Sequence, residues 1–259
     1  MVTIDILRAH GWQVPDDLLE NVSDYERDFM RLEFTGQRTF DYYRRRIAYL
    51  GLTGLDRVLD AGCGMGQWAL ALAEFNGQVE GIDLNEGRLA IGRRLLAAQE
   101  KSNVSLSKGS IEASNFPSEH FDAVFCYGVF MFTDMPRTLA EFHRVLKPGG
   151  KLYVNANSFG WYVHLLRDVP WNRRPALGII MNTLLRRKRA IIVSEPWLRA
   201  RLREAGFDVR MIACEGETTF RDNVIDIEKP EPGYARSYWG LRAMLEAVAV
   251  KRNPDATQA

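Results

Sequence analysis

Three glycines and an acidic residue form the segment of the sequence best suited to chemistry. The segment Asp60-Ala-Gly-Cys-Gly-Met-Gly66 follows a short apolar run from Arg57 and precedes an apolar stretch that begins at Gln67. Glycine adopts backbone conformations with positive φ at little steric cost and lets the main chain approach a ligand closely. A strand, a glycine-rich turn and a helix in this order predict a ligand site at the start of the helix.

A second acid narrows the class of ligand. Asp83 ends the next predicted strand, in Gly-Ile-Asp-Leu, where a carboxylate can accept the hydroxyl protons of an adenosine ribose. The alternatives are a plain strand-to-helix turn for the glycines and a helix cap for Asp83, although Asn85 is already placed to cap that helix. In dinucleotide enzymes the third glycine falls one residue later than Gly66, so a nicotinamide oxidoreductase is disfavoured.

Alternating strands and helices must position these residues. The sequence predicts strands at 57–60, 78–83, 104–107, 121–127, 151–156 and 207–213, and helices at 67–76, 86–100, 135–146 and 194–205. Residues 16–50 are predicted to be helical, and a strand near Val248 is favoured over a final helix. This alternation predicts a parallel sheet that helices cover on both faces.

Composition excludes several classes of protein. The 259 residues are 46% hydrophobic with a formal net charge of +1, which disfavours both disorder and a protein that coats nucleic acid. The three cysteines, Cys63, Cys126 and Cys214, form no Cys-x-x-Cys pair, so we expect neither a disulfide framework nor a zinc site. They suit a reducing cytoplasm. No signal peptide, membrane-spanning run or acidic metal cluster is expected.

Several motifs, in order, resemble the class I S-adenosylmethionine-dependent methyltransferases. They are VLDAGCGMG, GIDL, KGSIEASNFPSEHFDAVFCYGVF and EFHRVLKPGGKLYV, with a weaker echo in LRARLREAGFDV. The resemblance extends from about Tyr42 to Ala156. It implies an α/β, Rossmann-like fold whose seven-stranded, mostly parallel sheet has its last strand reversed and carries a helical lid after the fifth strand. It also implies S-adenosyl-L-methionine as cofactor and S-adenosyl-L-homocysteine as product. No cluster of Asp, Glu and His in the sequence looks like a metal site, so no metal is expected.

The resemblance also assigns cofactor-binding residues by position. They are Asp60, Gly62, Cys63, Gly64, Gly66, Asp83, Leu84, Ser110, Ile111, Tyr127 and Gly128. The first five would form or orient the turn against the methionine part, the next four would hold the ribose and adenine, and the last two would border the sulfonium. Ser110 stands where the family often has an aspartate, which leaves the hydrogen bond to the adenine amino group open; Glu112 is the substitute.

Methyl transfer is an in-line displacement that requires an aligned acceptor and, for some acceptors, a base. Of the four histidines, His10, His120, His143 and His164, only His164 follows the fifth predicted strand near the expected mouth of the site. We therefore expect His164 to be the catalytic base. The alternative is a lid histidine without a chemical role.

A basic, aromatic insert occupies residues 158–193. It carries seven cations against Asp168 alone, together with Trp161, Tyr162 and Trp171. Three interpretations remain open: a helical lid whose charges are solvated, recognition of an anionic acceptor through arginine, and a helix at a membrane surface.

The predicted organisation is an N-terminal helical cap at 1–50, the cofactor-binding core at 51–157, the acceptor lid at 158–193, the C-terminal part of the core sheet at 194–252 and a flexible tail at 253–259. The predicted function is methyl transfer, at oxygen, to a small-molecule or lipid-linked acceptor. The alternatives are an RNA or protein methyltransferase and a cofactor-binding regulator without catalysis. We expect a cytoplasmic protein with peripheral contact at the inner membrane surface and no nucleic-acid partner.

Overall fold

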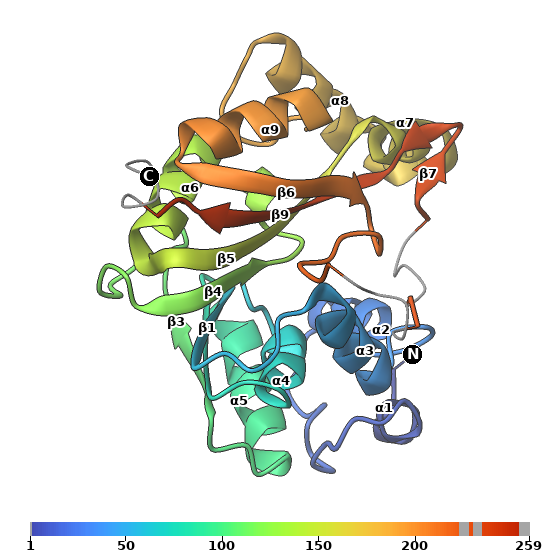
Figure 1. Cartoon of the computed structure of the whole chain (residues 1–259). Helices are drawn as coiled ribbons and strands as arrows, with labels where there is room; N and C mark the ends of the chain where they lie inside the picture. The colour runs from blue at the N-terminus through green and yellow to red at the C-terminus, as the bar shows by residue number, and fades with distance from the viewer. Residues whose placement is uncertain (1, 223–227, 230–234, 254–259) are drawn as a thin grey trace. The chain divides into compact units, whose positions relative to one another are not determined.

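The computed structural model describes residues 2–222, 228–229 and 235–253 (Figure 1). The chain divides into two compact units, Met1–Ser110 with Arg221–Pro230 and Ile111–Phe220 with Glu231–Ala259. The boundary after Ser110 falls inside the range 51–157 that the sequence assigns to one core. The predicted tail at 253–259 lies outside the described residues except for Asn253.

In the first unit, the described residues form three parallel strands and five helices. They are β1 (Arg57–Ala61), β2 (Gln78–Asp83) and β3 (Val104–Lys108), with α1 (Ile4–Ala9), α2 (Asp24–Glu33), α3 (Phe40–Leu50), α4 (Gln67–Ala73) and α5 (Glu86–Ala98). Strand β2 pairs with both other strands, with Val58 opposite Val79 and Val79 opposite Val104. This register brings the carboxyl ends of the three strands to one edge, where the glycine-rich turn begins.

The prediction of continuous helix over residues 16–50 is wrong in detail. Two separate helices occupy this range, because Ser23 and Thr39 each begin a new one. Their side chains accept hydrogen bonds from the backbone N–H groups of Glu26 and Tyr42, which is how N-cap residues satisfy the free donors at a helix start. Residues 16–21 form turns instead of helix.

The second unit contains the remaining strands of the large sheet and the helices of the insert. Its strands are β4 (Phe121–Cys126), β5 (Leu146–Asn157), β6 (Phe207–Cys214) and β9 (Met244–Lys251), with a short hairpin of β7 (Ser237–Tyr238) and β8 (Leu241–Arg242). Its helices are η1 (Phe130–Phe132), α6 (Met135–Val145), α7 (Phe159–Asp168), η2 (Pro170–Asn172), α8 (Arg173–Leu184) and α9 (Glu195–Glu204). Strand β9 runs antiparallel to β5 and β6, which confirms the reversed last strand.

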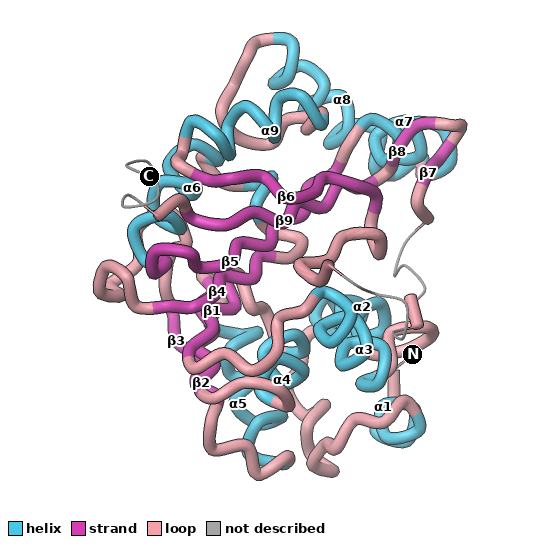
Figure 2. The backbone as a smooth tube through the Cα atoms, in the orientation of Figure 1, coloured by secondary structure: helices cyan, strands magenta, loops and turns pink. Residues whose placement is uncertain are grey.

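The large sheet has seven strands in the order β3-β2-β1-β4-β5-β9-β6, drawn in magenta in Figure 2. This order confirms the predicted α/β fold with a mostly parallel sheet, and it confirms a strand over the helix for the C-terminal segment. None of the helices within the described residues combines the length and the apolar character needed to cross a membrane.

Candidate cofactor site and lid

The glycine-rich turn begins where β1 ends and is held against the end of β2. The φ angles of Gly62, Gly64 and Gly66 are +84°, +55° and +79°, in the left-handed region that glycine occupies without strain. The backbone N–H groups of Gly62 and Cys63 donate to the carbonyl oxygen of Ile82 at 2.8 and 3.0 Å. The turn is therefore preformed, and α4 starts directly after it, as the sequence predicts.

Asp83 lies at the centre of this edge. One carboxylate oxygen accepts from the N–H of Gly64 at 3.0 Å, and the other accepts from the N–H of Asn85 at 2.8 Å. The cap of α5 is Asn85, whose side chain accepts from the N–H of Arg88, so Asp83 does not serve as that cap. The neighbouring Leu84 side chain is 67% exposed, which suits a residue that covers a flat ligand.

Ser110 stands beside the same edge because the chain returns to it after β3. The N–H of Gly109 donates to the carbonyl oxygen of Asp83 at 3.0 Å, and Ser110 follows, half-buried. The first unit thus brings together eight of the eleven predicted cofactor residues. Ile111, Tyr127 and Gly128 belong to the second unit.

Asp60 is a buried carboxyl with an unused oxygen. It is 1% exposed, and burial, followed by the nearby Asp83 carboxylate, raises its pKa from 3.8 to about 8. A hydrogen bond from the backbone N–H of Ala69 acts in the opposite direction. Within the described residues its Oδ2 atom has no hydrogen-bond partner, which is a costly arrangement for a buried acceptor. A site of this kind fits a cationic donor.

Cys63 plays a different part in the turn. Its side chain is 3% exposed, and burial, then Asp60 and Asp83, raises the pKa of its thiol well above 9.0. The neutral thiol packs as a small apolar group, 2.9 Å from where a Cβ at Gly81 would lie. Residue 81 must therefore stay small for the turn to sit against β2.

In the second unit, two side chains that the sequence did not single out hold the end of β4. The hydroxyl of Tyr127 donates to Glu215 Oε1 at 2.5 Å, and the N–H of Gly128 donates to Asn155 Oδ1 at 2.6 Å. Glu215 and Asn155 are both fully buried. Each left one signal in the sequence. Asn155 is a polar residue inside an apolar stretch of its strand, and Glu215 is an acid directly after a strand.

Glu112, the predicted substitute for the missing aspartate, is engaged elsewhere. Its carboxylate accepts from the N–H of Asp134 at 3.1 Å and from Arg189 of the insert at 2.7 Å. The neighbouring Ile111, which the sequence places beside the adenine, is buried, with 6% of its surface exposed. The side chain of Glu112 therefore ties the insert to the segment before β4.

His164 lies on α7, which begins two residues after β5 ends. Its Nδ1 atom is 2.9 Å from Asp168 Oδ2, and its ring stacks on Tyr238 with 4.0 Å between ring centroids. The hydrogen bond with His164 is the main cause that lowers the pKa of Asp168 below its ordinary range. This arrangement fixes the ring and directs one nitrogen toward a carboxylate, as in histidines that act as bases.

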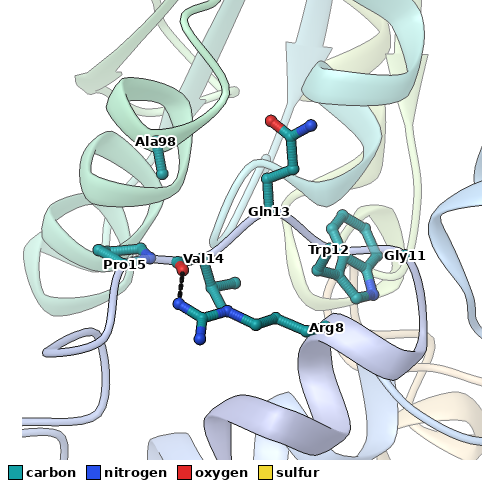
Figure 3. Close-up of a pocket in the computed structure, with 7 residues that line it drawn as sticks. All are labelled: Arg8, Gly11, Trp12, Gln13, Val14, Pro15 and Ala98. Atoms are coloured by element: carbon teal, nitrogen blue, oxygen red, sulfur yellow. Dashed lines mark hydrogen bonds between the residues drawn. The ribbon is translucent and has the colours of Figure 1, made fainter.

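A hollow of about 670 Å³ lies near the N-terminus (Figure 3). It is lined by Arg8, Gly11, Trp12, Gln13, Val14, Pro15 and Ala98. Arg8 donates to the carbonyl oxygen of Val14 at 2.8 Å, and the indole of Trp12 donates to Phe34. None of the predicted site residues lines this hollow, and the hydrogen bonds of Arg8 and Trp12 hold the N-terminal segment.

Comparison with known proteins places this geometry in a family. The model of the Methyltransferase domain family matches residues 58–150. A demethylmenaquinone methyltransferase from Symbiobacterium thermophilum is 36% identical over 184 residues, which cover 62% of this chain and 73% of that protein. The chain belongs to the class I S-adenosylmethionine-dependent methyltransferases.

Other relatives of the same name align over shorter stretches. The demethylmenaquinone methyltransferase from Shouchella clausii is 41% identical over 98 residues, so the match covers 36% of this chain and 42% of the relative. The methyltransferase whose structure was solved in complex with the Haloferax volcanii Trm112 methyltransferase activator has a TM-score of 0.62 at 20% identity, over 89% of this chain and 96% of that one. At this identity the likeness shows the fold alone.

The residues of the first unit fit the cofactor of this methyltransferase family. S-adenosylmethionine carries a cationic amino group and a ribose with two hydroxyls. The unused Oδ2 of buried Asp60 suits the amino group, and the half-buried Asp83 suits the ribose. We propose these two contacts, with Leu84 and Ser110 beside the adenine and the glycine turn against the methionine part.

Replacing Asp83 by alanine is expected to weaken S-adenosylmethionine binding by about 1–3 kcal/mol, roughly five- to 150-fold, the cost of leaving buried polar groups unpaired. Titration calorimetry measures the change, with Glu86→Ala, on the exposed start of α5, as control. Asp83→Ala also removes the hydrogen bonds from Gly64 and Asn85, so circular dichroism must show that the variant still folds. Unchanged affinity would contradict the ribose assignment.

Proposed function

We propose that this methyltransferase transfers a methyl group from S-adenosylmethionine to a small, apolar, quinone-type acceptor, free or lipid-linked, that bears an ionisable hydroxyl. The observation that carries the acceptor class is the alignment over 184 residues with a protein named demethylmenaquinone methyltransferase. The acceptor atom we propose is the hydroxyl oxygen. A ring carbon activated by that hydroxyl is the alternative, and either route requires the loss of one acceptor proton.

The bound cofactor supplies a methyl group on a positively charged sulfur, already activated for displacement. The chain has three tasks: to hold the cofactor, to align the acceptor and to remove the proton. Asp60 and Asp83 would perform the first. Tyr127 and Gly128 would border the reacting centre, and their partners Glu215 and Asn155 keep that turn rigid.

His164 is the proposed proton acceptor. With Nδ1 protonated and donating to Asp168, the lone pair resides on Nε2, where it can take the proton of an acceptor hydroxyl. The stacked ring of Tyr238 holds the imidazole plane in place. Asp168 is a positioning residue in this scheme, because it acts only through the histidine.

The direct test combines purified protein, methyl-labelled S-adenosylmethionine and a reduced demethylmenaquinone with a short side chain. We expect label in the quinone product, and mass spectrometry of that product separates methylation at oxygen from methylation at carbon. Label transferred to RNA or protein in a cell extract, but not to the quinone, would favour the alternative acceptors. Cofactor binding without turnover on any acceptor would favour a regulator.

We also propose that the protein works in the cytoplasm, at the inner surface of the membrane, with residues 158–193 as the contact. A lipid-linked acceptor is confined to that surface, and the insert carries seven cations against a single acid, together with two tryptophans. The lid and arginine-recognition interpretations are compatible with this placement, since one segment can cover the acceptor and touch lipid.

A further inference from the structure

Helix α8 has two apolar sides, only one of which is used for packing. The inward side holds Ala176, which is fully buried, and Ile179, Ile180 and Thr183, which are half-buried. The outward side holds a second stripe at the spacing i, i+4, i+7 and i+8, formed by Leu177, Met181, Leu184 and Leu185. These four side chains are 53%, 51%, 71% and 59% exposed. A helix at the surface of a globular domain normally carries polar side chains there.

The charges around this stripe are all of one sign. No Asp or Glu occurs between Asp168 and Glu195, whereas the interval contains Arg173, Arg174, Arg186, Arg187, Lys188 and Arg189. Arg173 donates to a backbone carbonyl and Arg189 pairs with Glu112. For the other four cations, all exposed, the described part of the chain provides no ion pair. They bracket the apolar stripe, with Arg174 at one end and residues 186–188 at the other.

A hollow beside the basic turn combines charge with apolar walls. Its volume is about 600 Å³, and its lining includes Arg186, Arg187 and Arg201 together with Phe159, Ile192 and Trp197. Arginine recognises phosphate oxygens through paired N–H donors. Trp171, in η2 directly before α8, is 80% exposed, and tryptophan favours the boundary between water and lipid. Figure 1 shows α8 and the turn that follows it.

We propose that this α8 face, defined as Leu177, Met181, Leu184 and Leu185 with Arg174, Arg186, Arg187 and Lys188, docks on a bilayer that contains anionic phospholipid. The helix would lie in the interface, with its apolar stripe among the acyl chains and its cations on lipid phosphates. The charge pattern favours an anionic bilayer as the partner, because cations flank the apolar stripe at both ends and no acid lies between Asp168 and Glu195. The inference deepens the proposed function, because it names the surface through which a lipid-linked acceptor is reached.

Flotation of the full-length protein with vesicles tests the docking face without cofactor or acceptor. We expect binding to vesicles of phosphatidylglycerol and phosphatidylcholine, weaker binding in high salt, and little binding to phosphatidylcholine alone. Leu184→Asp should lower the partition coefficient at least about ten-fold, because a charge replaces a buried leucine in the interface. Arg187→Gln should lower it about five-fold, equivalent to about 1 kcal/mol for a cation near an anionic surface.

Matched changes elsewhere separate docking from general effects. Leu32→Asp alters a leucine on α2 that is 52% exposed, and Arg137→Gln removes an exposed cation on α6; neither should change vesicle binding. The inference would be overturned if the wild-type protein does not bind anionic vesicles. It would also be overturned if Leu32→Asp and Leu184→Asp lower vesicle binding equally. If only the α8 variants lose vesicle binding, the docking inference is supported even if the quinone is not methylated. If the protein methylates the quinone but does not bind vesicles, the docking inference is rejected and the proposed function stands.

Discussion

Turnover of the proposed acceptor is expected to fall by about two to four powers of ten when His164 is replaced by alanine, the usual contribution of a positioned base. The structure gives this expectation a geometric basis. The Asp168 contact at 2.9 Å directs Nδ1, and stacking on Tyr238 at 4.0 Å fixes the ring plane. Removal of the imidazole leaves Asp168 without the ring through which it acts. Steady-state kinetics with the labelled cofactor provide the measurement.

The control variants distinguish a loss of chemistry from a loss of the packing around α7. Asp168→Asn should lower kcat by less than His164→Ala while cofactor affinity is unchanged, because it disturbs only the tautomer and orientation of the ring. His120→Ala removes a histidine from the loop before β4 and should leave turnover near the wild-type rate. If His164→Ala also retains a near-normal kcat, His164 has no part in the mechanism and serves only to pack α7 against Tyr238.

The parts of the site that could be predicted from the sequence depend on neighbours in the chain. The turn at residues 60–66 requires glycine at positions with positive φ, and Asp83 is the last residue of its strand. Such short-range constraints leave a visible pattern of residue types. The parallel, helix-covered sheet followed from the alternation of strands and helices, whereas the reversed last strand was implied by the family resemblance. The helix boundaries in the first fifty residues depended on two capping residues that were not recognised.

The unpredicted parts depend on pairs that are distant in sequence. Tyr127 and Glu215 are separated by 88 residues, and Gly128 and Asn155 by 27, so neither pairing leaves a local signature. The outward stripe of α8 is visible in the sequence, but its exposure is not. Its apolar residues are obvious in the sequence, but only the structure separates the packed side, with Ala176, from the exposed side, with Leu184.

Asp60→Asn is expected to stabilise the cofactor-free protein, and more so as the pH rises. The pKa of Asp60 is about 8 in the folded protein and near 3.8 when the chain is unfolded, because burial and Asp83 disfavour the charged form. Between these values the unfolded chain gives up the proton that the folded protein keeps. Rising pH therefore lowers the free energy of unfolding from about pH 4 until the folded carboxyl ionises near pH 8.

Asparagine does not titrate, so the free energy of unfolding of the variant does not fall in this pH range for this reason. The stability difference between variant and wild type should widen from about pH 4 to about pH 8 and then level off. The expected gain is on the order of several kcal/mol, since one pKa unit corresponds to about 1.4 kcal/mol. Urea denaturation at pH 5 and pH 8 measures it. A difference that is the same at both pH values would show that Asp60 does not titrate in this way.

The same substitution should harm cofactor binding, and these opposite effects on stability and binding would mark Asp60 as a functional residue. The buried Oδ2 has no partner within the described residues, and the neutral amide cannot offer a cationic amino group the same attraction. S-adenosylhomocysteine, which keeps that amino group, should therefore raise the melting temperature of Asp60→Asn less than that of the wild type. An equal shift in both proteins would mean that the costly burial of Asp60 serves the turn alone, and the amino-group contact would have to be abandoned.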